Sequence, residues 1–436
     1  MNVAASPHTQ PPEADEPFDV GSTDDSLERM IGLFGRLGDT YRVYVPTRRS
    51  YTYVIHHPDD VKRVLVSNHR NYTKGAGIDR VKLLLGKGIM TSEGELWKSQ
   101  RYMLQPSFHR KVVTGFADLL AQANDRFIER WEGLARRGEL VNVTEEMSEL
   151  TLEIVLRSIL GIDHDRLTLE HGANPFEVVA KDQARNPQFV YKFRSLTKIL
   201  QQLIARRREE AAEHFDFLAM LMSVRDKESG QPMAERQLID ELMTLVVAGH
   251  ETTASALNWV WYLLSQHPQA LAQLHAEVDA AADLPAPSLA QMEELPYTQQ
   301  VVNEALRLYP PGWVLSRRTI EADVLGGYPI PSRTDVLLPL YLLHRHPRFW
   351  RDPEAFWPER FAPEHEAERP RFAYMPFAAG PRHCIGETFA LYEMLVHLYK
   401  VARRYRLTYV PDAALELEAL INLRTRRPLH MRLEAR

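Results

Sequence analysis

The chain has 436 residues but a single cysteine, Cys384. One thiol cannot form an internal disulfide, and nothing else in the sequence completes a four-ligand zinc site with it. So few cysteines also suit a reducing compartment. Cys384 must therefore serve either packing, which is the commoner fate of a lone cysteine, or the reactivity of its sulfur.

The sequence also lacks an apolar run near its start and an excess of basic charge. Its first 25 residues contain four prolines and six acidic residues but no Lys or Arg, unlike a signal peptide or a membrane anchor. A formal net charge of -5 and a pI near 6.4 provide no basic field for nucleic acid. We expect a disordered or loosely packed arm over residues 1–24, followed by one domain over 25–436. The protein should be soluble and cytoplasmic, with no membrane anchor and no nucleic-acid partner.

Long helical patterns dominate the rest of the sequence, which has no internal repeat and no Gly/Ser-rich linker. Alternating residues rich in Tyr, Val and Thr predict a hairpin over 41–55, and short strands are expected over 323–340 and 407–433. These patterns predict a mainly α fold with a small β region in a single large domain. Helices are expected from about residue 26 and over 58–67, 94–104, 111–136, 145–160, 196–212, 215–225, 234–266, 269–281, 299–308 and 386–404.

Cys384 lies in the segment Phe377-Ala-Ala-Gly-Pro-Arg-His-Cys-Ile-Gly386. Two glycines, a proline and an arginine so close together predict a rigid turn with exposed amides and a nearby positive charge. These conditions favour a thiolate and allow a metal to approach the backbone closely. The helix expected to follow would place its positive N-terminal end at that thiolate.

The segment matches the pattern F-x-x-G-x-R-x-C-x-G at all five specified positions, and the chain therefore resembles the cytochromes P450, which are haem-thiolate monooxygenases. The resemblance implies the P450 fold and haem b as the cofactor. It makes Cys384 the axial ligand of the iron and places Phe377 and Gly380 in the loop beside the haem.

A second polar feature interrupts the longest helical pattern, at Ala248-Gly-His-Glu-Thr-Thr253. Glycine, an acid and hydroxyl groups disfavour or compete with helical hydrogen bonds. One interpretation is local: the threonines bond to nearby carbonyls and Glu251 turns to water. In the family the acid and the alcohol lie over the haem and help deliver protons to bound dioxygen, which gives Glu251 and Thr252 a proton-relay role. The small residues Ala248 and Gly249 would let the flat macrocycle lie against the helix.

Glu304 and Arg307 lie three residues apart, so they share one helical face. Such pairs are common on surfaces and contribute only about a few tenths of a kcal/mol there. The resemblance adds Arg360, from the segment Phe356-Trp-Pro-Glu-Arg-Phe361. It predicts that the three residues form a partly buried charge network that braces the haem pocket.

The two haem propionates need cationic or donor partners, for which the planar guanidinium of arginine is well suited. Among these partners, the assignment of Arg318 is the one most easily confused, because Arg317 lies next to it in the sequence. His109 and His383 are expected on the surface or behind the direct ligands, because the resemblance already supplies thiolate ligation. The positions that match the family's usual propionate partners are Trp97, Arg101, Arg318 and Arg382.

The activity implied by the resemblance is insertion of one atom of O2 into an apolar substrate, by hydroxylation or epoxidation. The electrons would come from a separate ferredoxin or flavodoxin-type donor with its reductase, because the chain shows no flavin-binding or iron–sulfur segment. Lys98, Arg110 and Lys111 are candidate docking charges, although an ordinary solvated basic face explains them equally well. Two alternatives stay open: a haem-thiolate peroxygenase or isomerase, and a non-catalytic haem sensor of gas or redox state.

Substrate specificity should come from apolar segments that match the family's substrate-contacting regions. Their composition favours an apolar ligand of medium or large size. The segments are 75–90, 163–212, 311–315 and 421–423, and the candidate contact residues are Val314, Leu315, Ile421 and Leu423.

Overall fold

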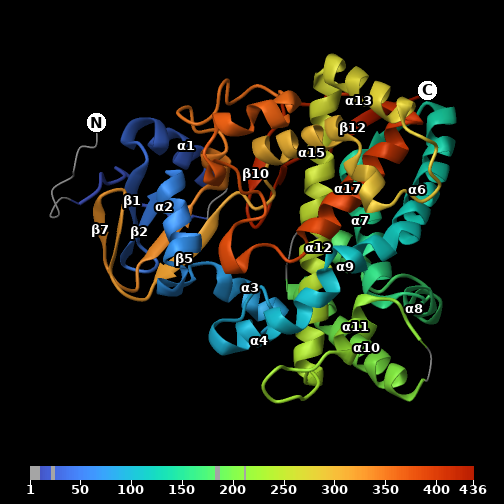
Figure 1. Ribbon diagram of the computed structural model, residues 1–436, viewed down its shortest axis with the longest axis horizontal. Coiled ribbons are helices and arrows are strands. Elements are labelled where there is room, and N and C mark those ends of the chain that lie inside the picture. The colour runs from blue at the N-terminus through green and yellow to red at the C-terminus, as the bar shows by residue number, and fades with distance from the viewer. Residues whose placement is uncertain (1–9, 21–24, 182–186, 211–212) are drawn as a thin grey trace. The chain divides into compact units, whose positions relative to one another are not determined.

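The computed structural model describes residues 10–20, 25–181, 187–210 and 213–436 (Figure 1). Helices dominate and the strands form small sheets, as the sequence predicts. The chain divides into two compact units, which we call the sheet unit and the helical unit. The sheet unit comprises Met1–Ile78, Gln299–Cys384 and Ala413–Arg427, and the helical unit comprises Asp79–Thr298, Ile385–Asp412 and Pro428–Arg436.

The sheet unit is built on a five-stranded sheet of order β1-β2-β8-β5-β3. The predicted hairpin over 41–55 is present, with Thr40 opposite Ile55. Two further antiparallel pairs, β6 with β7 and β10 with β11, supply some of the other expected strands. The elements are β1 (Thr40–Val45), β2 (Ser50–Ile55), β3 (Tyr72–Lys74), β5 (Leu315–Thr319), β6 (Asp323–Leu325), β7 (Tyr328–Ile330), β8 (Asp335–Leu338), β10 (Leu417–Ala419), β11 (Leu423–Thr425), α1 (Ser26–Leu37), α2 (Pro58–Lys62), α15 (Pro296–Leu308) and α16 (Leu340–Leu343).

The expectation of a loose arm over 1–24 is wrong for its described part, residues 10–20. Backbone bonds join Ala14 and Pro12 to Arg42 of β1, and the side chain of Phe18 is buried in the core beneath the sheet. Acidic residues of this segment form ion pairs with Arg36 and Arg42. The acidic composition that suggests disorder thus finds basic partners on α1 and β1; residues 1–9 and 21–24 lie outside the described residues.

The helical unit is organised around the long helix α12, against which α7 packs along much of its length (Figure 1). A three-stranded antiparallel sheet of order β4-β12-β9 belongs to the same unit. The elements are α3 (Ile78–Leu85), α4 (Gly94–Leu104), α5 (Arg110–Val113), α6 (Ala117–Arg137), β4 (Leu140–Asn142), α7 (Val143–Leu160), α8 (Asp163–His171), α9 (Glu177–Lys181), α10 (Pro187–Glu209), α11 (Phe217–Ser223), α12 (Glu235–Gln266), α13 (Pro268–Ala280), α14 (Leu289–Glu293), α17 (Glu387–Ala402), β9 (Tyr405–Tyr409) and β12 (His430–Ala435).

The longer predicted helices are present with shifted ends, and the differences have physical causes. The helix expected over 111–136 is broken by a 3-10 turn at Thr114–Phe116, where Gly115 lies against the ring of Phe215. The short helices α3, α14 and α16 were not predicted, and α8 and α9 lie in the segment 163–212, where the resemblance implied helices without giving their individual bounds. Segments this short carry too few turns to establish a helical period, and packing decides their conformation.

Candidate functional site

Cys384 lies at the end of a tightly bonded loop in the sheet unit. Its backbone N–H donates to the carbonyl of Phe377 at 3.0 Å, and the N–H of His383 donates to the carbonyl of Gly380 at 3.0 Å. The side chain of Cys384 is nevertheless exposed. A cysteine that serves packing is normally buried, so exposure within a well-ordered loop argues against the packing interpretation.

Two residues in the left-handed region shape this loop: Ala378 has φ 61° and Gly380 has φ 74°. A Cβ atom on Gly380 would lie 1.9 Å from the carbonyl oxygen of Leu65, so only glycine fits there. At Ala378 the same backbone conformation costs about 1 kcal/mol or more. The loop is therefore held in an unfavourable shape by its surroundings.

The structure places Glu304, Arg307 and Arg360 in one buried network. Glu304 accepts a bidentate pair of bonds from Arg307, at 2.7 and 2.8 Å, and a third from Nε of Arg360 at 2.9 Å. All three side chains are at most 4% exposed. The network is thus more deeply buried than the sequence suggested, and loss of one member would leave a buried charge without its partner.

His344 joins this network to the cysteine loop, a connection that the sequence analysis missed. Arg307 donates to the carbonyl of His344 at 2.9 Å, and Nε2 of His344 accepts the N–H of Met375 at 3.0 Å. Burial lowers the pKa of His344 to about 3. The ring is therefore neutral at physiological pH and can act as an acceptor. No short motif surrounds His344; the apolar run before it was the only signal of its burial.

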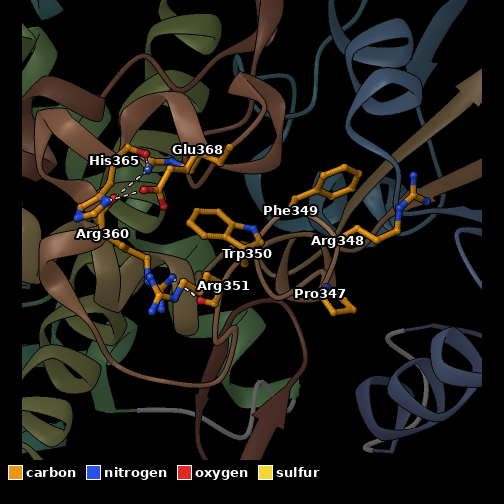
Figure 2. Close-up of a pocket in the computed structure, with 9 residues that line it drawn as sticks. Pro347, Arg348, Phe349, Trp350, Arg351, Arg360, His365 and Glu368 are labelled. Atoms are coloured by element: carbon orange, nitrogen blue, oxygen red, sulfur yellow. Dashed lines mark hydrogen bonds and ion pairs between the residues drawn. The ribbon is translucent and has the colours of Figure 1, made fainter.

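Behind the network, Arg360 also donates to the backbone carbonyls of Arg351 and Asp352, at 2.7 and 3.1 Å. It borders a pocket of about 170 Å³, in which Figure 2 shows the ring of Trp350 between Arg360 and Arg348. The lining residues of the pocket are Pro347, Arg348, Phe349, Trp350, Arg351, Arg360, His365, Glu368 and Arg369.

In the helical unit, one face of α12 is accessible within a stretch of the helix that is otherwise buried. We call it the open face. Ala248, Glu251 and Thr252 are partly exposed, whereas most residues between Leu238 and Leu264 are buried. Their spacing of three and four residues puts the three on one side of the helix. The small, acidic and hydroxyl side chains singled out in the sequence therefore share an accessible surface.

Gly249 lies at the contact between α12 and α7. A Cβ atom there would lie 2.8 Å from Cγ2 of Val155 on α7, so this glycine allows the two helices to pack closely. Next to it, His250 is buried, and its Nε2 lies 2.9 Å from the hydroxyl of Ser148 on α7.

The hydroxyl of Thr252 makes a local bond. It donates to the carbonyl of Ala248, one turn earlier, at 2.7 Å. This is the local interpretation of the motif, and it means that Thr252 must give up this bond to donate elsewhere.

The cytochrome P450 family model matches residues 17–422. The chain belongs to the cytochrome P450 family. It is 34% identical to Protein LUTEIN DEFICIENT 5 of Arabidopsis thaliana over 83% of this chain and 66% of that protein. It is 31% identical to cyclooctat-9-en-7-ol 5-monooxygenase of Streptomyces melanosporofaciens over 87% of this chain and 84% of that enzyme. The crystal structure of the cytochrome P450DA heme domain matches with a TM-score of 0.86, at 23% identity, over 98% of each chain, and shows the same fold.

This cytochrome P450 is therefore a monooxygenase of a family that binds haem b through a cysteine thiolate. Its residues fit such a group. Within the sheet unit, Cys384 supplies an exposed thiol on a loop whose backbone is held by hydrogen bonds, which suits thiolate ligation. No helix among the described residues is long and apolar enough to cross a membrane.

The predicted propionate partners of this P450 lie in both units. Arg318 of β5 donates twice to Asp335 of β8, at 2.9 and 3.0 Å, which orients its guanidinium. Arg382 is partly buried in the cysteine loop, two residues before Cys384. In the helical unit, Trp97 and Arg101 lie one turn apart on α4, where Nε of Arg101 donates to Gln105 at 3.2 Å.

Arg317 and His109 have well-defined surroundings in the structure. Arg317 is buried and donates to the carbonyl of Ser316 at 2.8 Å, unlike its half-exposed neighbour Arg318. His109 is exposed and caps α5 through the N–H of Lys111.

The candidate docking and substrate residues of this P450 are only partly available. Lys98 is paired with Glu95 at 2.6 Å and Arg110 is bonded to Glu293, whereas Lys111 is exposed. Leu423 is fully buried in the sheet-unit core, which argues against the substrate contact predicted for it. Ile421 is 56% exposed, and Val314 and Leu315 are partly buried against the core.

Proposed function

We propose that this P450 inserts one oxygen atom into a large, mainly hydrocarbon substrate, by hydroxylation or epoxidation. The exposed sulfur of Cys384, on a loop tied to a buried charge network, is the observation that carries the proposal. A similar enzyme is named for oxidising cyclooctat-9-en-7-ol, an alcohol on a hydrocarbon frame. This supports an alicyclic, largely apolar substrate class.

Haem bound by Cys384 would supply oxygen activation, which the electron density of a thiolate ligand promotes. The chain's own residues hold and supply protons around it. The network of Glu304, Arg307 and Arg360 would keep the cysteine loop in one shape, while Arg318 and Arg382 would bind the propionates. Because Arg318 is hydrogen-bonded to Asp335, its guanidinium is already oriented before a haem propionate binds.

The open face of α12 would deliver protons. Glu251 can take a proton from solvent and pass it through an ordered water to the hydroxyl of Thr252. Thr252 would then release the carbonyl of Ala248 and turn its O–H outward. The small side chain of Ala248 leaves space for oxygen on the same face.

The electrons would come from a separate ferredoxin or flavodoxin-type donor with its reductase. Lys111, exposed at the start of α5, is the candidate docking charge that the structure leaves without a close carboxylate among the described residues. A peroxygenase would instead form product from peroxide alone. A gas or redox sensor would form no product, either with the electron donor and O2 or with peroxide.

The first experiment is the carbon monoxide difference spectrum of the reduced protein. A band near 450 nm is expected, since it reports a thiolate opposite the gas. The Cys384→Ser variant should lose this band while remaining folded by circular dichroism. A band near 420 nm in fresh, folded wild-type protein would contradict thiolate ligation by Cys384.

A further inference from the structure

A loop of the helical unit, Gly86–Ser92, is bonded to the N-terminal half of α12. The N–H of Lys87 donates to Oδ2 of Asp240 at 2.8 Å, and the N–H of Ile89 donates to Oε2 of Glu241 at 2.8 Å. Both carboxylates are buried, with Asp240 at 6% and Glu241 at 0% exposure. Two adjacent buried acids on one helix thus accept two backbone amides of the loop that lie two residues apart.

The loop approaches α12 so closely that side chains are excluded from two of its positions. A Cβ atom on Gly86 would lie 2.4 Å from the carboxylate of Asp240. One on Gly88 would lie 2.1 Å from the hydroxyl of Thr244 and 2.7 Å from the backbone carbonyl of Asp240. The contact therefore depends on glycine at both positions as well as on the two acids.

Hydrogen bonds also hold the opposite side of the loop. The side-chain amide of Gln100, fully buried on α4, donates to the carbonyl of Lys87 at 2.6 Å. The hydroxyl of Thr91 donates to the carbonyl of Gly86 at 2.7 Å, which closes the loop on itself. Such a loop has one preferred conformation, and its position is set by α12 and α4 together.

The part of α12 that binds the loop is followed along the helix by the accessible face that contains Ala248 and Thr252. Glu241, Thr244, Ala248 and Thr252 follow one another at three- and four-residue spacing, so they lie along one side of the helix. The loop thus ends its contact one turn before Ala248. Two apolar residues of the loop lie next to this contact: Ile89 is partly exposed and Met90 is exposed.

We propose that Asp240 and Glu241 are positioning residues that hold Gly86–Ser92 as a wall of the substrate site and so determine which ligand size the site accepts. The inference rests on the proposed function, because the open face of α12 must be the reacting face. Carboxylates are costly to bury, and an apolar residue would be cheaper unless the loop amides needed acceptors. Holding these amides is therefore the function of the two acids.

The test compares variants that remove the acceptor with variants that keep it. Asp240→Ala and Glu241→Met abolish the bonds to the loop, whereas Asp240→Asn and Glu241→Gln keep an acceptor oxygen. Arg236→Gln is the matched control, because Arg236 is 72% exposed and pairs with the other oxygen of Asp240 at 3.2 Å. Gly88→Ala displaces the loop with both acids intact and so tests the same idea if an acid variant fails to fold.

Amide hydrogen exchange gives the first measurement. The amides of Lys87 and Ile89 should exchange about tenfold faster or more in Asp240→Ala and Glu241→Met, since each loses a hydrogen bond. The Asn, Gln and Arg236→Gln variants should exchange like the wild type. Unchanged exchange in the acceptor-free variants would overturn the inference.

Optical titration with two azoles gives the second measurement. The Kd for 4-phenylimidazole should rise about tenfold in the acceptor-free and Gly88→Ala variants, whereas that for imidazole, which is too small to reach the wall, should stay within about twofold. Equal Kd values for 4-phenylimidazole in wild type and variants would overturn the inference while leaving the proposed function standing. Failure of the wild type to bind either azole would overturn both.

Discussion

At the scale of single residues, His344 shows how one side chain can couple two functional parts. It accepts the N–H of Met375 at the start of the cysteine loop, while its carbonyl accepts from Arg307. Burial keeps the ring neutral, and only the neutral ring can accept at Nε2. The charge network thus reaches the loop through a histidine rather than directly.

Replacing His344 by alanine should therefore loosen the cysteine loop. The N–H of Met375 would lose its acceptor in a buried place, at a cost of about 1–3 kcal/mol. We expect a larger share of the 420 nm form in the carbon monoxide spectrum of His344→Ala, and partial recovery in His344→Asn, whose side chain keeps an acceptor. His109→Ala, an exposed-site control, should keep the wild-type spectrum; an unaltered His344→Ala spectrum would refute the coupling.

Thr252 carries a second prediction at this scale. Without its hydroxyl, Thr252→Ala cannot pass a proton from Glu251, and product formation should fall about 10- to 100-fold. Electron consumption should continue, with oxygen released as peroxide. The measurement is the ratio of peroxide to product per electron pair in a reconstituted assay. Thr252→Ser should restore most coupling, whereas equal coupling in Thr252→Ala and wild type would remove Thr252 from the relay.

At the scale of elements, the contact between α7 and α12 depends on the absence of a side chain at Gly249. The nearest atom to a Cβ there belongs to Val155 of α7, at 2.8 Å. The hydroxyl of Thr151, also on α7, donates to the carbonyl of Met147 at 2.9 Å and lies 3.3 Å from the backbone carbonyl oxygen of His250. Packing against α7 thus fixes the position of α12, including its accessible face.

Gly249→Ala should consequently push the two helices apart and lower the free energy of unfolding by about 1–3 kcal/mol. Val155→Ala should relieve the clash, so the double variant should be more stable than the sum of the single losses predicts. Gly35→Ala, in α1 with nothing within 4 Å of its Cβ, is the control and should be neutral or stabilising. Urea unfolding measures all four; additive losses in the double variant would contradict the clash.

At the scale of the whole molecule, buried neutral histidines recur in both units. His56 and His344 are fully buried in the sheet unit, and His397 is fully buried in the helical unit. His397 joins α6, α17 and α12, because its Nδ1 bonds to Asn124 at 2.8 Å and its Nε2 accepts from Trp261 at 2.9 Å. Burial lowers the pKa of His56 to about 4 and the pKa of His344 and His397 to about 3.

The protein should therefore lose stability as the pH falls below about 6.5. The unfolded chain binds protons on these histidines at their ordinary pKa, whereas the folded state does not, so each contributes a loss of about 2 kcal/mol by pH 5. Glu393 acts in the opposite direction, because burial raises its pKa and acid relieves that penalty. Urea midpoints at pH 7.5, 6 and 5 should decrease in that order; a constant or rising midpoint would contradict the prediction.

Short sequence patterns were sufficient to predict the family, the cysteine loop and the pairing of Glu304 with Arg307. Each of these features depends on residues within a few positions of one another. The helix over 234–266 and the hairpin over 41–55 were equally readable, since their side-chain periods extend over many residues. Arg360 needed the family resemblance, because it reaches Glu304 from 56 residues away.

The sequence by itself thus determined which chemical groups this P450 possesses and in what order they occur. Only the tertiary structure decided which neighbour each one meets: Gly249 faces Val155, Leu423 enters the core, and the loop Gly86–Ser92 rests on Asp240 and Glu241. The physical reason is that a local pattern places a side chain relative to the axis of its own helix or strand. The partner on the other side comes from a distant segment, and close packing selects it.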